Sequence, residues 1–228
     1  MTTIGVIVPA KDEARLLPRC LTALAEARVR LRLVDPSVVV HVLVVLDSCR
    51  DDSAEIVAAH PSVNALAVQA SCVGVARQCG LRHLLDVVPG TDWFANTDAD
   101  SAVPPDWLMT QLAAARDGTD LLLGSVRPAP EDLTEVELAG WRARHDLGDG
   151  HQHVFGANLG FNRRTLARTG GFRPLPVHED VDLTRRARAA GLVVQATGAS
   201  PVVTSARRAG RTPSGFAAYV ARELISDA

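Results

Sequence analysis

Short apolar runs alternate with helical patterns through the first half of the chain. Residues 4–8 form an apolar, β-branched run that Pro9 ends, which is typical of a buried strand. Residues 13–28 carry apolar side chains three and four positions apart, which predicts an amphipathic helix. The pattern recurs, with strands predicted at residues 38–46, 65–69 and 93–95 and helices at residues 53–60 and 74–85. This alternation predicts an α/β fold, a mostly parallel open sheet with helices on both faces.

The second half of the chain is less regular. Helices are predicted at residues 107–116 and 181–190, strands at 120–126, 192–196 and 201–204, and an amphipathic helix at 216–224. The polar stretch 128–155 is expected to form a helix and a mobile loop, whose His145, His151 and His153 are interpreted as surface residues that could contact a ligand. No linker or internal repeat divides the chain, so we expect a single domain over residues 1–228.

Polar clusters follow three of the predicted strands, at residues 9–13, 47–53 and 96–100. Ligands of open α/β sheets bind beyond the carboxyl ends of the strands. We therefore expect these clusters to converge in space although they lie far apart in the sequence. Within the third cluster, Asp98 and Asp100 project to the same side of an extended chain. Such a pair is typical of a site for Mg²⁺ or Mn²⁺, although two solvated loop acids are the simpler alternative.

Three further segments carry candidate chemistry. Glu179, Asp180 and Asp182 fall at the start of a predicted helix, where the helix dipole favours acids and where one carboxylate could act as a general base. Gly156, Ala157 and Asn158 form either a turn or a close approach to a ligand. The basic residues Arg207, Arg208 and Arg211 suit a pyrophosphate, or form a solvated loop in a chain with a single lysine, Lys11.

The composition excludes several function classes. The net charge of −2 argues against bulk nucleic-acid binding. The sequence contains no dinucleotide-binding or P-loop glycine motif, which counts against oxidoreductases and P-loop enzymes. It contains neither a signal peptide nor an apolar run of the ~20 residues that a membrane-spanning helix needs, so we expect a soluble, cytoplasmic protein.

Taken in order, the clusters resemble the motifs of glycosyltransferase family 2, whose members are inverting, nucleotide-sugar-dependent enzymes of the GT-A fold. The resemblance covers residues 3–191 and rests on seven loose motifs in the right order. They are VPAKDE at 8–13, VVLDSCRDDS at 44–53, ARQCG at 76–80, DAD with PPDWL at 98–108, GAN with Phe161, GGF at 170–172, and EDVDL with Arg186.

The resemblance implies a division of the chain and a role for each motif. Residues 1–100 would form a Rossmann-like half that binds a UDP- or GDP-sugar, and residues 101–228 a half that binds an unknown hydroxyl acceptor. Asp180 would be the catalytic base with Glu179 beside it, and Gly156, Ala157 and Asn158 would face the acceptor. Asp98 and Asp100 would hold the donor diphosphate through Mn²⁺ or Mg²⁺. The donor site would include Pro9, Ala10, Asp12, Glu13, Asp47 (for the base), Arg77, Asp98, Arg207, Arg208 and Arg211.

The sequence departs from the family pattern at several positions. Leu46 stands where the family has the first acid of an Asp pair, and Asp12 stands where it has Asn. No histidine follows His178, so a carboxyl-terminal histidine metal ligand is missing, and Thr204 or Ser205 is expected near that position. These departures keep open a non-catalytic nucleotide-sugar-binding protein. A sugar nucleotidyltransferase is the other alternative, although the loop after the first strand lacks the glycines that a triphosphate requires.

Overall fold

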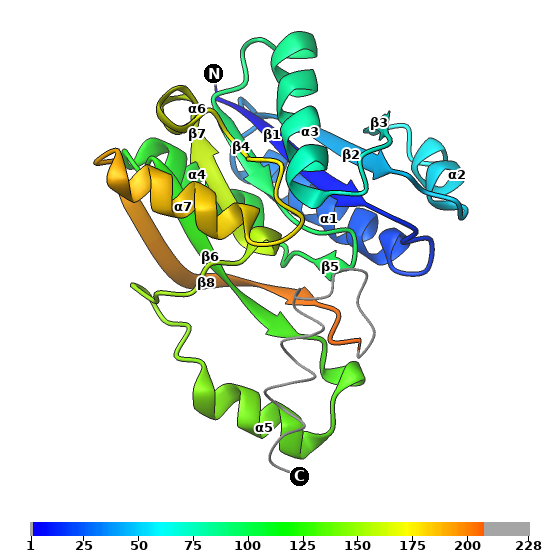
Figure 1. Ribbon diagram of the computed structural model, residues 1–228, viewed down its shortest axis with the longest axis vertical. Coiled ribbons are helices and arrows are strands. Elements are labelled where there is room, and N and C mark those ends of the chain that lie inside the picture. The colour runs from blue at the N-terminus through cyan, green and yellow to red at the C-terminus, as the bar shows by residue number, and fades with distance from the viewer. Residues whose placement is uncertain (1, 208–228) are drawn as a thin grey trace.

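The computed structural model describes residues 2–207, and this part of the chain contains one sheet of eight strands in the order β3-β2-β1-β4-β7-β6-β8-β5 (Figure 1). The strands are β1 (Thr3–Ala10), β2 (Val39–Asp47), β3 (Val63–Val68), β4 (Trp93–Asn96), β5 (Ser101–Ala102), β6 (Leu121–Pro128), β7 (Leu159–Asn162) and β8 (Val194–Thr204). The helices are α1 (Leu17–Val34), α2 (Ser53–Ala58), α3 (Val73–Val87), α4 (Trp107–Arg116), α5 (Glu135–Arg144), α6 (Arg163–Thr169) and α7 (Glu179–Ala189), with short 3-10 turns η1 (Pro130–Asp132) and η2 (Gly156–Asn158).

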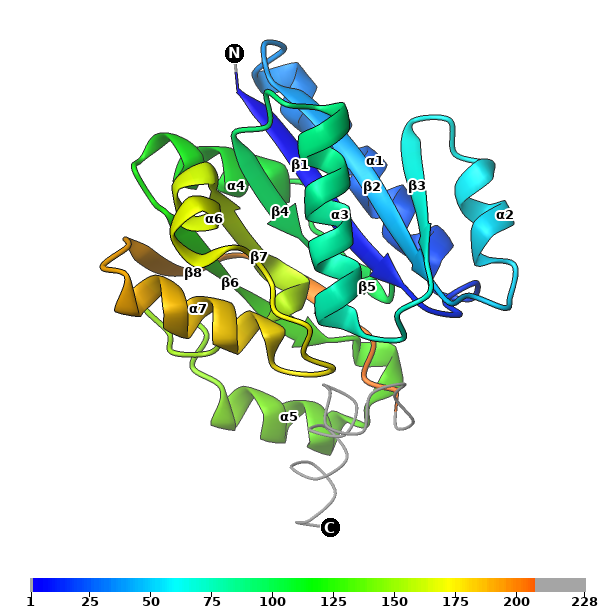
Figure 2. The same cartoon turned by 45° about the horizontal axis from the view of Figure 1, so that its top comes forward.

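The first half of the chain forms the parallel part of the sheet. Strands β3, β2, β1 and β4 pair in parallel, and along the chain α1 joins β1 to β2, α2 joins β2 to β3, and α3 joins β3 to β4. Side chains alternate between two cores along β1: Ile4, Val6 and Val8 pack on one face and Ile7 packs on the other. Helices α1 and α4 cover the first face, while α3 and α7 cover the second (Figure 2). The predicted α/β class, with an open sheet between helices, is confirmed.

The second half of the chain is mixed in direction. Strand β7 runs antiparallel to both β4 and β6, β8 runs parallel to β6, and β5 pairs antiparallel with β8. The patterns did not predict β5, β7 or α6, because two- and four-residue strands and a single short helix carry too little periodicity. Two strands were predicted at residues 192–204, but β8 is one strand of 11 residues. Its pairing with β6 is irregular, because the register shifts between Gly124 and Val126.

The polar stretch 128–155 contains η1 and α5, which a capping box begins: the Thr134 hydroxyl accepts from the Glu137 backbone N–H, and the Glu137 carboxylate accepts from the Thr134 backbone N–H. Arg208, Arg211 and the helix predicted at residues 216–224 lie outside the described residues. Within residues 2–207, every helix is too short or too polar to cross a bilayer.

Candidate active site

The loops that follow β1 and β2 are joined to each other at the carboxyl edge of the sheet. Asp12, whose φ of 51° is left-handed, accepts the backbone N–H of Arg50 at 2.6 Å. The backbone N–H of Glu13 donates to the Ser53 hydroxyl at 3.0 Å. Pro9 and Ala10 end β1 beside Val45 and Leu46 of β2. The sequence clusters 9–13 and 47–53 therefore do converge, as expected from the parallel topology.

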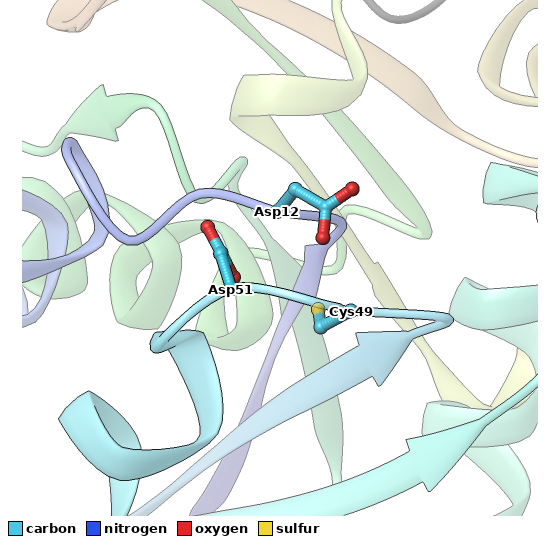
Figure 3. Close-up of side chains that lie close together, drawn as sticks. All are labelled: Asp12, Cys49 and Asp51. Atoms are coloured by element: carbon cyan, nitrogen blue, oxygen red, sulfur yellow. The ribbon is translucent and has the colours of Figure 1, made fainter.

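Asp12, Cys49 and Asp51 place one potential ligand atom each within 4.8 Å of one another, and they are the single group of three such residues found within residues 2–207 (Figure 3). Each side chain already stabilises the loops. Asp51 accepts the Ala14 and Ser53 backbone N–H groups, and the Cys49 thiol donates to the Ala10 carbonyl. Burial raises the pKa of Cys49, which disfavours the thiolate that would bind a metal. We assign this group to loop structure.

Asp47, the residue expected to recognise the nucleotide base, holds the segment that leads into α3. Its Oδ1 accepts the backbone N–H groups of Ala70 and Ser71, both at 2.8 Å, and its Oδ2 accepts that of Cys72 at 2.9 Å. Burial opposes ionisation, but these backbone donors outweigh it and lower the pKa of Asp47. The carboxylate thus fixes the segment between β3 and α3, and its direct contact with a base stays a prediction.

A group of acids lies at the carboxyl edge of the sheet, and we call it the acidic edge: Glu13, Asp98, Asp100, Glu179 and Asp180. Arg77 lies at its centre and is only 1% exposed. From α3 its guanidinium reaches three side chains: Nη2 donates to Asp98 Oδ1 at 2.6 Å, Nε donates to Glu179 Oε1 at 3.0 Å, and Nη1 donates to Asn96 Oδ1 at 3.3 Å. The Phe172 ring lies 5.7 Å from its guanidinium carbon, a cation–π contact. Arg77 joins the Asp98 segment to the start of α7, and its expected approach to the nucleotide stays a prediction.

Asp98 and Asp100 follow β4 and differ in their surroundings. The Asp98 side chain is 36% exposed and pairs with Arg77, whereas that of Asp100 is 18% exposed. Burial and the nearby Asp98 charge raise the pKa of Asp100 to about 7. A divalent cation would relieve this repulsion, and carboxylate oxygens are the ligands that Mg²⁺ and Mn²⁺ prefer. Asp98 and Asp100 therefore fit a divalent ion. Such an ion is what the expected role of the Asp98-Ala99-Asp100 motif requires.

A second arginine closes the rim of the acidic edge. Arg207 donates two hydrogen bonds to the Glu13 carboxylate, at 2.7 and 2.8 Å, and its Nη2 lies 3.1 Å from Asp100 Oδ2. The Thr204 hydroxyl lies 3.4 Å from Asp100 Oδ1, while the Ser205 hydroxyl donates to Asp132. Of the two residues expected near the missing histidine, Thr204 contacts the Asp100 carboxylate, whereas Ser205 contacts Asp100 only through its backbone N–H, which donates to the Asp100 carbonyl at 3.1 Å.

Glu179 and Asp180 begin α7 after His178, which has a left-handed φ of 61°. Burial raises the pKa of Glu179 to about 7, against the opposing Arg77 charge. Burial also raises the pKa of Asp180, whose Oδ1 accepts the Val181 backbone N–H. Carboxylates with raised pKa values hold protons more strongly than ordinary acids, which suits a general base near neutral pH. The third acid, Asp182, instead binds Arg186 at 2.7 Å and has a lowered pKa, since this arginine and Arg185 outweigh its burial.

The Gly156–Asn158 turn lies beside the acidic edge but differs from expectation. A Cβ on Gly156 would lie 2.7 Å from Arg77 Nη2 and 3.3 Å from Asp180 Oδ2, so the glycine makes room for these two side chains. Asn158 is buried, donates to the Ser125 and Ser200 carbonyls and accepts from Trp107 Nε1. Asn158 and Ala157 are therefore packed inside the protein, whereas Gly156 is half-buried, and acceptor contact at this turn stays a prediction.

The histidines of the 128–155 stretch correct another expectation. His145 and His151 are buried rather than exposed on a surface loop. The His145 ring stacks on Trp141 with centroids 3.7 Å apart, and His153 stacks on Phe155 at 5.8 Å. These aromatic contacts give the segment a core of its own, which polar composition alone does not reveal.

The family model of "Glycosyl transferase family 2" matches residues 5–169, well over half of the chain. The chain belongs to glycosyl transferase family 2. The match begins in β1 and ends with α6, so it includes the segments of Asp12, Arg77 and Asp98. A search of curated proteins finds no significant match.

Solved glycosyltransferases share the fold. The S. aureus TarS structure with UDP-GlcNAc is 17% identical with a TM-score of 0.67, and the alignment covers 95% of this chain and 62% of that one. The Pyrobaculum calidifontis mannosyltransferase PcManGT, in complex with GDP-Man and Mn²⁺, is 23% identical with a TM-score of 0.61, over 91% and 58%. Mycobacterium tuberculosis glucosyl-3-phosphoglycerate synthase with Mn²⁺, UDP and phosphoglyceric acid is 18% identical with a TM-score of 0.55, over 86% and 70%. The chain thus spans about three fifths of the TarS and PcManGT structures.

Two residues of the site received no role from the sequence. Asn96, at the end of β4, is fully buried and accepts from Arg77. Phe172 covers the Arg77 guanidinium and follows two glycines with left-handed φ values. In the sequence, Asn96 is a polar residue at the end of an apolar strand, and Phe172 is an aromatic residue after two glycines. These patterns could have drawn attention to the two residues, but only their contacts with Arg77 show what they do.

Proposed function

We propose that the protein is a metal-dependent, inverting glycosyltransferase that moves one sugar from a UDP- or GDP-sugar to an acceptor hydroxyl. Family membership supports the activity class. The buried Arg77 bridge carries the proposal for this chain, because it ties Asp98 of the donor side to Glu179, the neighbour of Asp180, on the other side. Well-packed apolar residues in place of a buried ion pair are often as stable or more so, so the presence of this charged link beside Asp98 supports a functional role.

The bridge divides the work between the two acids of α7. Glu179 is 6% exposed in its side chain and is held by Arg77 Nε, so we assign it to orienting the guanidinium. Asp180 faces Gly156, the half-buried residue of the turn that we assign to the acceptor side. Asp180 is therefore the base in this proposal, with Glu179 as its positioning neighbour.

The reaction follows from this placement. Asp180 takes the proton of the acceptor hydroxyl as its oxygen bonds to the anomeric carbon. The bond from that carbon to the diphosphate oxygen breaks on the opposite side, which inverts the configuration and releases a nucleoside diphosphate. A divalent ion held by Asp98 and Asp100 would supply positive charge for the leaving diphosphate. Arg77 keeps Asp98 and the α7 acids at a constant separation while this happens.

The donor site extends along the carboxyl edge of the parallel strands. Pro9, Ala10, Asp12 and Glu13 would line it after β1, and Asp47 would shape the base pocket. We assign residues 1–100 to donor binding and 101–228 to the acceptor. Arg207 contacts Glu13 and Asp100 within this edge, which supports a role on the diphosphate side.

Donor binding and turnover test the proposal. Thermal-shift titrations with UDP, GDP and their sugars, each with and without Mn²⁺, identify the donor, since a ligand at 100 times its Kd adds about 2.7 kcal/mol of stability. Release of nucleoside diphosphate is then measured over a panel of hydroxyl acceptors. A metal-dependent shift followed by release is the expected result. Tight donor binding with no release over the panel favours a non-catalytic nucleotide-sugar-binding protein, and release of pyrophosphate from a nucleoside triphosphate and a sugar phosphate favours a nucleotidyltransferase.

A further inference from the structure

Arg207 pairs with the Asp100 carboxylate, which is one of the two proposed metal ligands. Its Nη2 lies 3.1 Å from Asp100 Oδ2, and both guanidinium nitrogens donate to Glu13. The side chains of Glu13 and Asp100 are only 9% and 18% exposed, so this positive charge is a substantial part of their surroundings. A divalent ion on Asp100 would lie beside the guanidinium and be repelled by it.

The two arginines of the edge differ in how easily they can exchange partners. Arg77 is 1% exposed and its three hydrogen-bonded nitrogens point into the protein. Arg207 is 22% exposed in its side chain and lies at the rim. Of the two, Arg207 is the one whose guanidinium lies where a bound phosphate can reach it, and a divalent ion would then pair the Asp100 carboxylate in its place.

The backbone at Arg207 is anchored independently of its guanidinium. Asp132 of η1 accepts both the Ser205 hydroxyl at 2.9 Å and the Ala206 backbone N–H at 2.8 Å. The Ser205 backbone N–H donates to the Asp100 carbonyl at 3.1 Å. The end of β8 therefore stays in place when the side chain changes partners, and a local rotation is enough for the exchange.

We propose that Arg207 is a built-in counter-ion of the metal site, which holds Asp100 in the donor-free protein and releases it only when a divalent ion and a nucleoside diphosphate bind together. The inference rests on the proposed function and adds that the divalent ion and the nucleoside diphosphate bind together. The diphosphate brings the negative charge that the guanidinium can bind in place of Asp100, and arginine suits phosphate oxygens through its paired N–H groups. Metal and nucleotide must then strengthen each other's binding by the same factor.

Mn²⁺ binding without turnover tests this coupling. The Kd of Mn²⁺ is measured by electron paramagnetic resonance of the free ion, with no nucleotide, with UDP and with GDP. The variants are Arg207→Gln and the charge-retaining Arg207→Lys. Arg116→Gln is the matched control, because Arg116 also pairs with one acid, Asp35 at 2.8 Å, on a different part of the surface. Circular dichroism confirms that each variant is folded.

We expect the wild-type protein to bind Mn²⁺ about tenfold or more tightly when UDP or GDP is present, within the range usual for coupled sites. Arg207→Gln should bind Mn²⁺ alone about tenfold more tightly than wild type and lose most of the coupling to the nucleotide. Arg207→Lys should lie between them, and Arg116→Gln should match wild type.

Three outcomes contradict the inference in distinguishable ways. Unchanged or weaker Mn²⁺ binding by Arg207→Gln, with normal nucleotide coupling, means that Arg207 is only structural, and it leaves the transferase proposal intact. Nucleotide binding with no Mn²⁺ binding in any sample removes the metal from both proposals. Absence of both nucleotide and Mn²⁺ binding overturns the proposed function itself.

Discussion

The two arginines of the acidic edge do the same chemistry in different surroundings. Arg77 is buried between α3, the Asp98 segment and α7, and it contacts Asn96, Asp98 and Glu179. Arg207 lies at the rim, after β8, and contacts Glu13 and Asp100. Burial makes the first bridge a permanent part of the fold, because losing it would strand a charge away from water. Exposure makes the second bridge exchangeable, so the same guanidinium–carboxylate pairing stabilises one side of the site and controls access to the other.

The largest effect is expected on the Arg77 side, from Asp180→Asn. The amide cannot accept the acceptor's proton, so turnover should fall by roughly 10²–10⁴-fold, the usual contribution of a general base. Donor affinity should stay near the wild-type value, since Asp180 is not in the proposed donor pocket. Initial rates of nucleoside diphosphate release and donor titrations measure the two quantities. Full turnover by this variant would reject Asp180 as the base.

Removing the buried bridge comes next. Arg77→Met leaves Glu179 buried without its cation, and breaking such a pair costs about 3–5 kcal/mol of folding free energy. Urea unfolding measures the loss. Arg207→Met is the direct comparison, and we expect a smaller loss, of about 1 kcal/mol, because the Arg207 side chain is 22% exposed and that of Arg77 only 1%. Equal losses for the two variants would contradict the contrast between them.

Adding a single methyl group at Gly156 should disturb the packing around the Arg77 guanidinium. Gly156→Ala puts a Cβ 2.7 Å from Arg77 Nη2, and Arg77 has no free space to move into. Overpacking of this kind costs roughly 1–3 kcal/mol. The thermal midpoint should fall, and turnover should fall with it because Asp180 lies 3.3 Å from the same position. Gly90→Ala is the control, since a Cβ there meets nothing within 4 Å. A turnover loss of similar size in both variants would show that the crowding at Gly156 has no specific effect.

The smallest expected effect concerns Asp100, a partner of Arg207, and it is a change of stability that depends on pH. The pKa of Asp100 is about 7 in the folded protein against 3.8 for an ordinary aspartate, because burial disfavours its charged form. The folded state therefore binds more protons than the unfolded state between these values, and this contribution to stability is lost as pH rises towards 7. In metal-free protein, Asp100→Asn should raise the melting temperature at pH 8 and change it little below pH 4. Melting curves at both pH values measure the difference, and a larger gain at low pH would reverse the sign.

The sequence predicted the parallel half of the fold well and the mixed half poorly. Strands β1 and β2 are buried on both faces, so their apolar runs are long and unambiguous. Strand β7 has four residues and β5 has two, and neither is long enough to show a period. The register of β6, β7 and β8 depends on pairings between residues far apart in the chain, which local patterns do not contain.

The candidate site was predicted in its residue types but not in its contacts. Motif order and strand ends singled out Asp98, Asp100, Glu179 and Asp180, whose catalytic and metal-binding roles stay predictions. The pattern assigned Asn158 to the acceptor, whereas the structure buries it with Trp107, Ser125 and Ser200 as partners. An asparagine that follows two small residues gives the same sequence pattern whether it faces a ligand or a protein carbonyl, so only its neighbours in space distinguish the two.

By itself, the sequence determined the α/β class, the family and the set of acids at the carboxyl edge, because these depend on local hydrophobic runs and on motif order along the chain. The tertiary structure alone decided which acid each arginine neutralises. Arg77 and Glu179 are 102 residues apart, and Arg207 and Glu13 are 194 apart. Charge pairing falls off with distance in space and not in sequence, so the division between a buried bridge and an exchangeable one emerges only when the sheet brings these residues together.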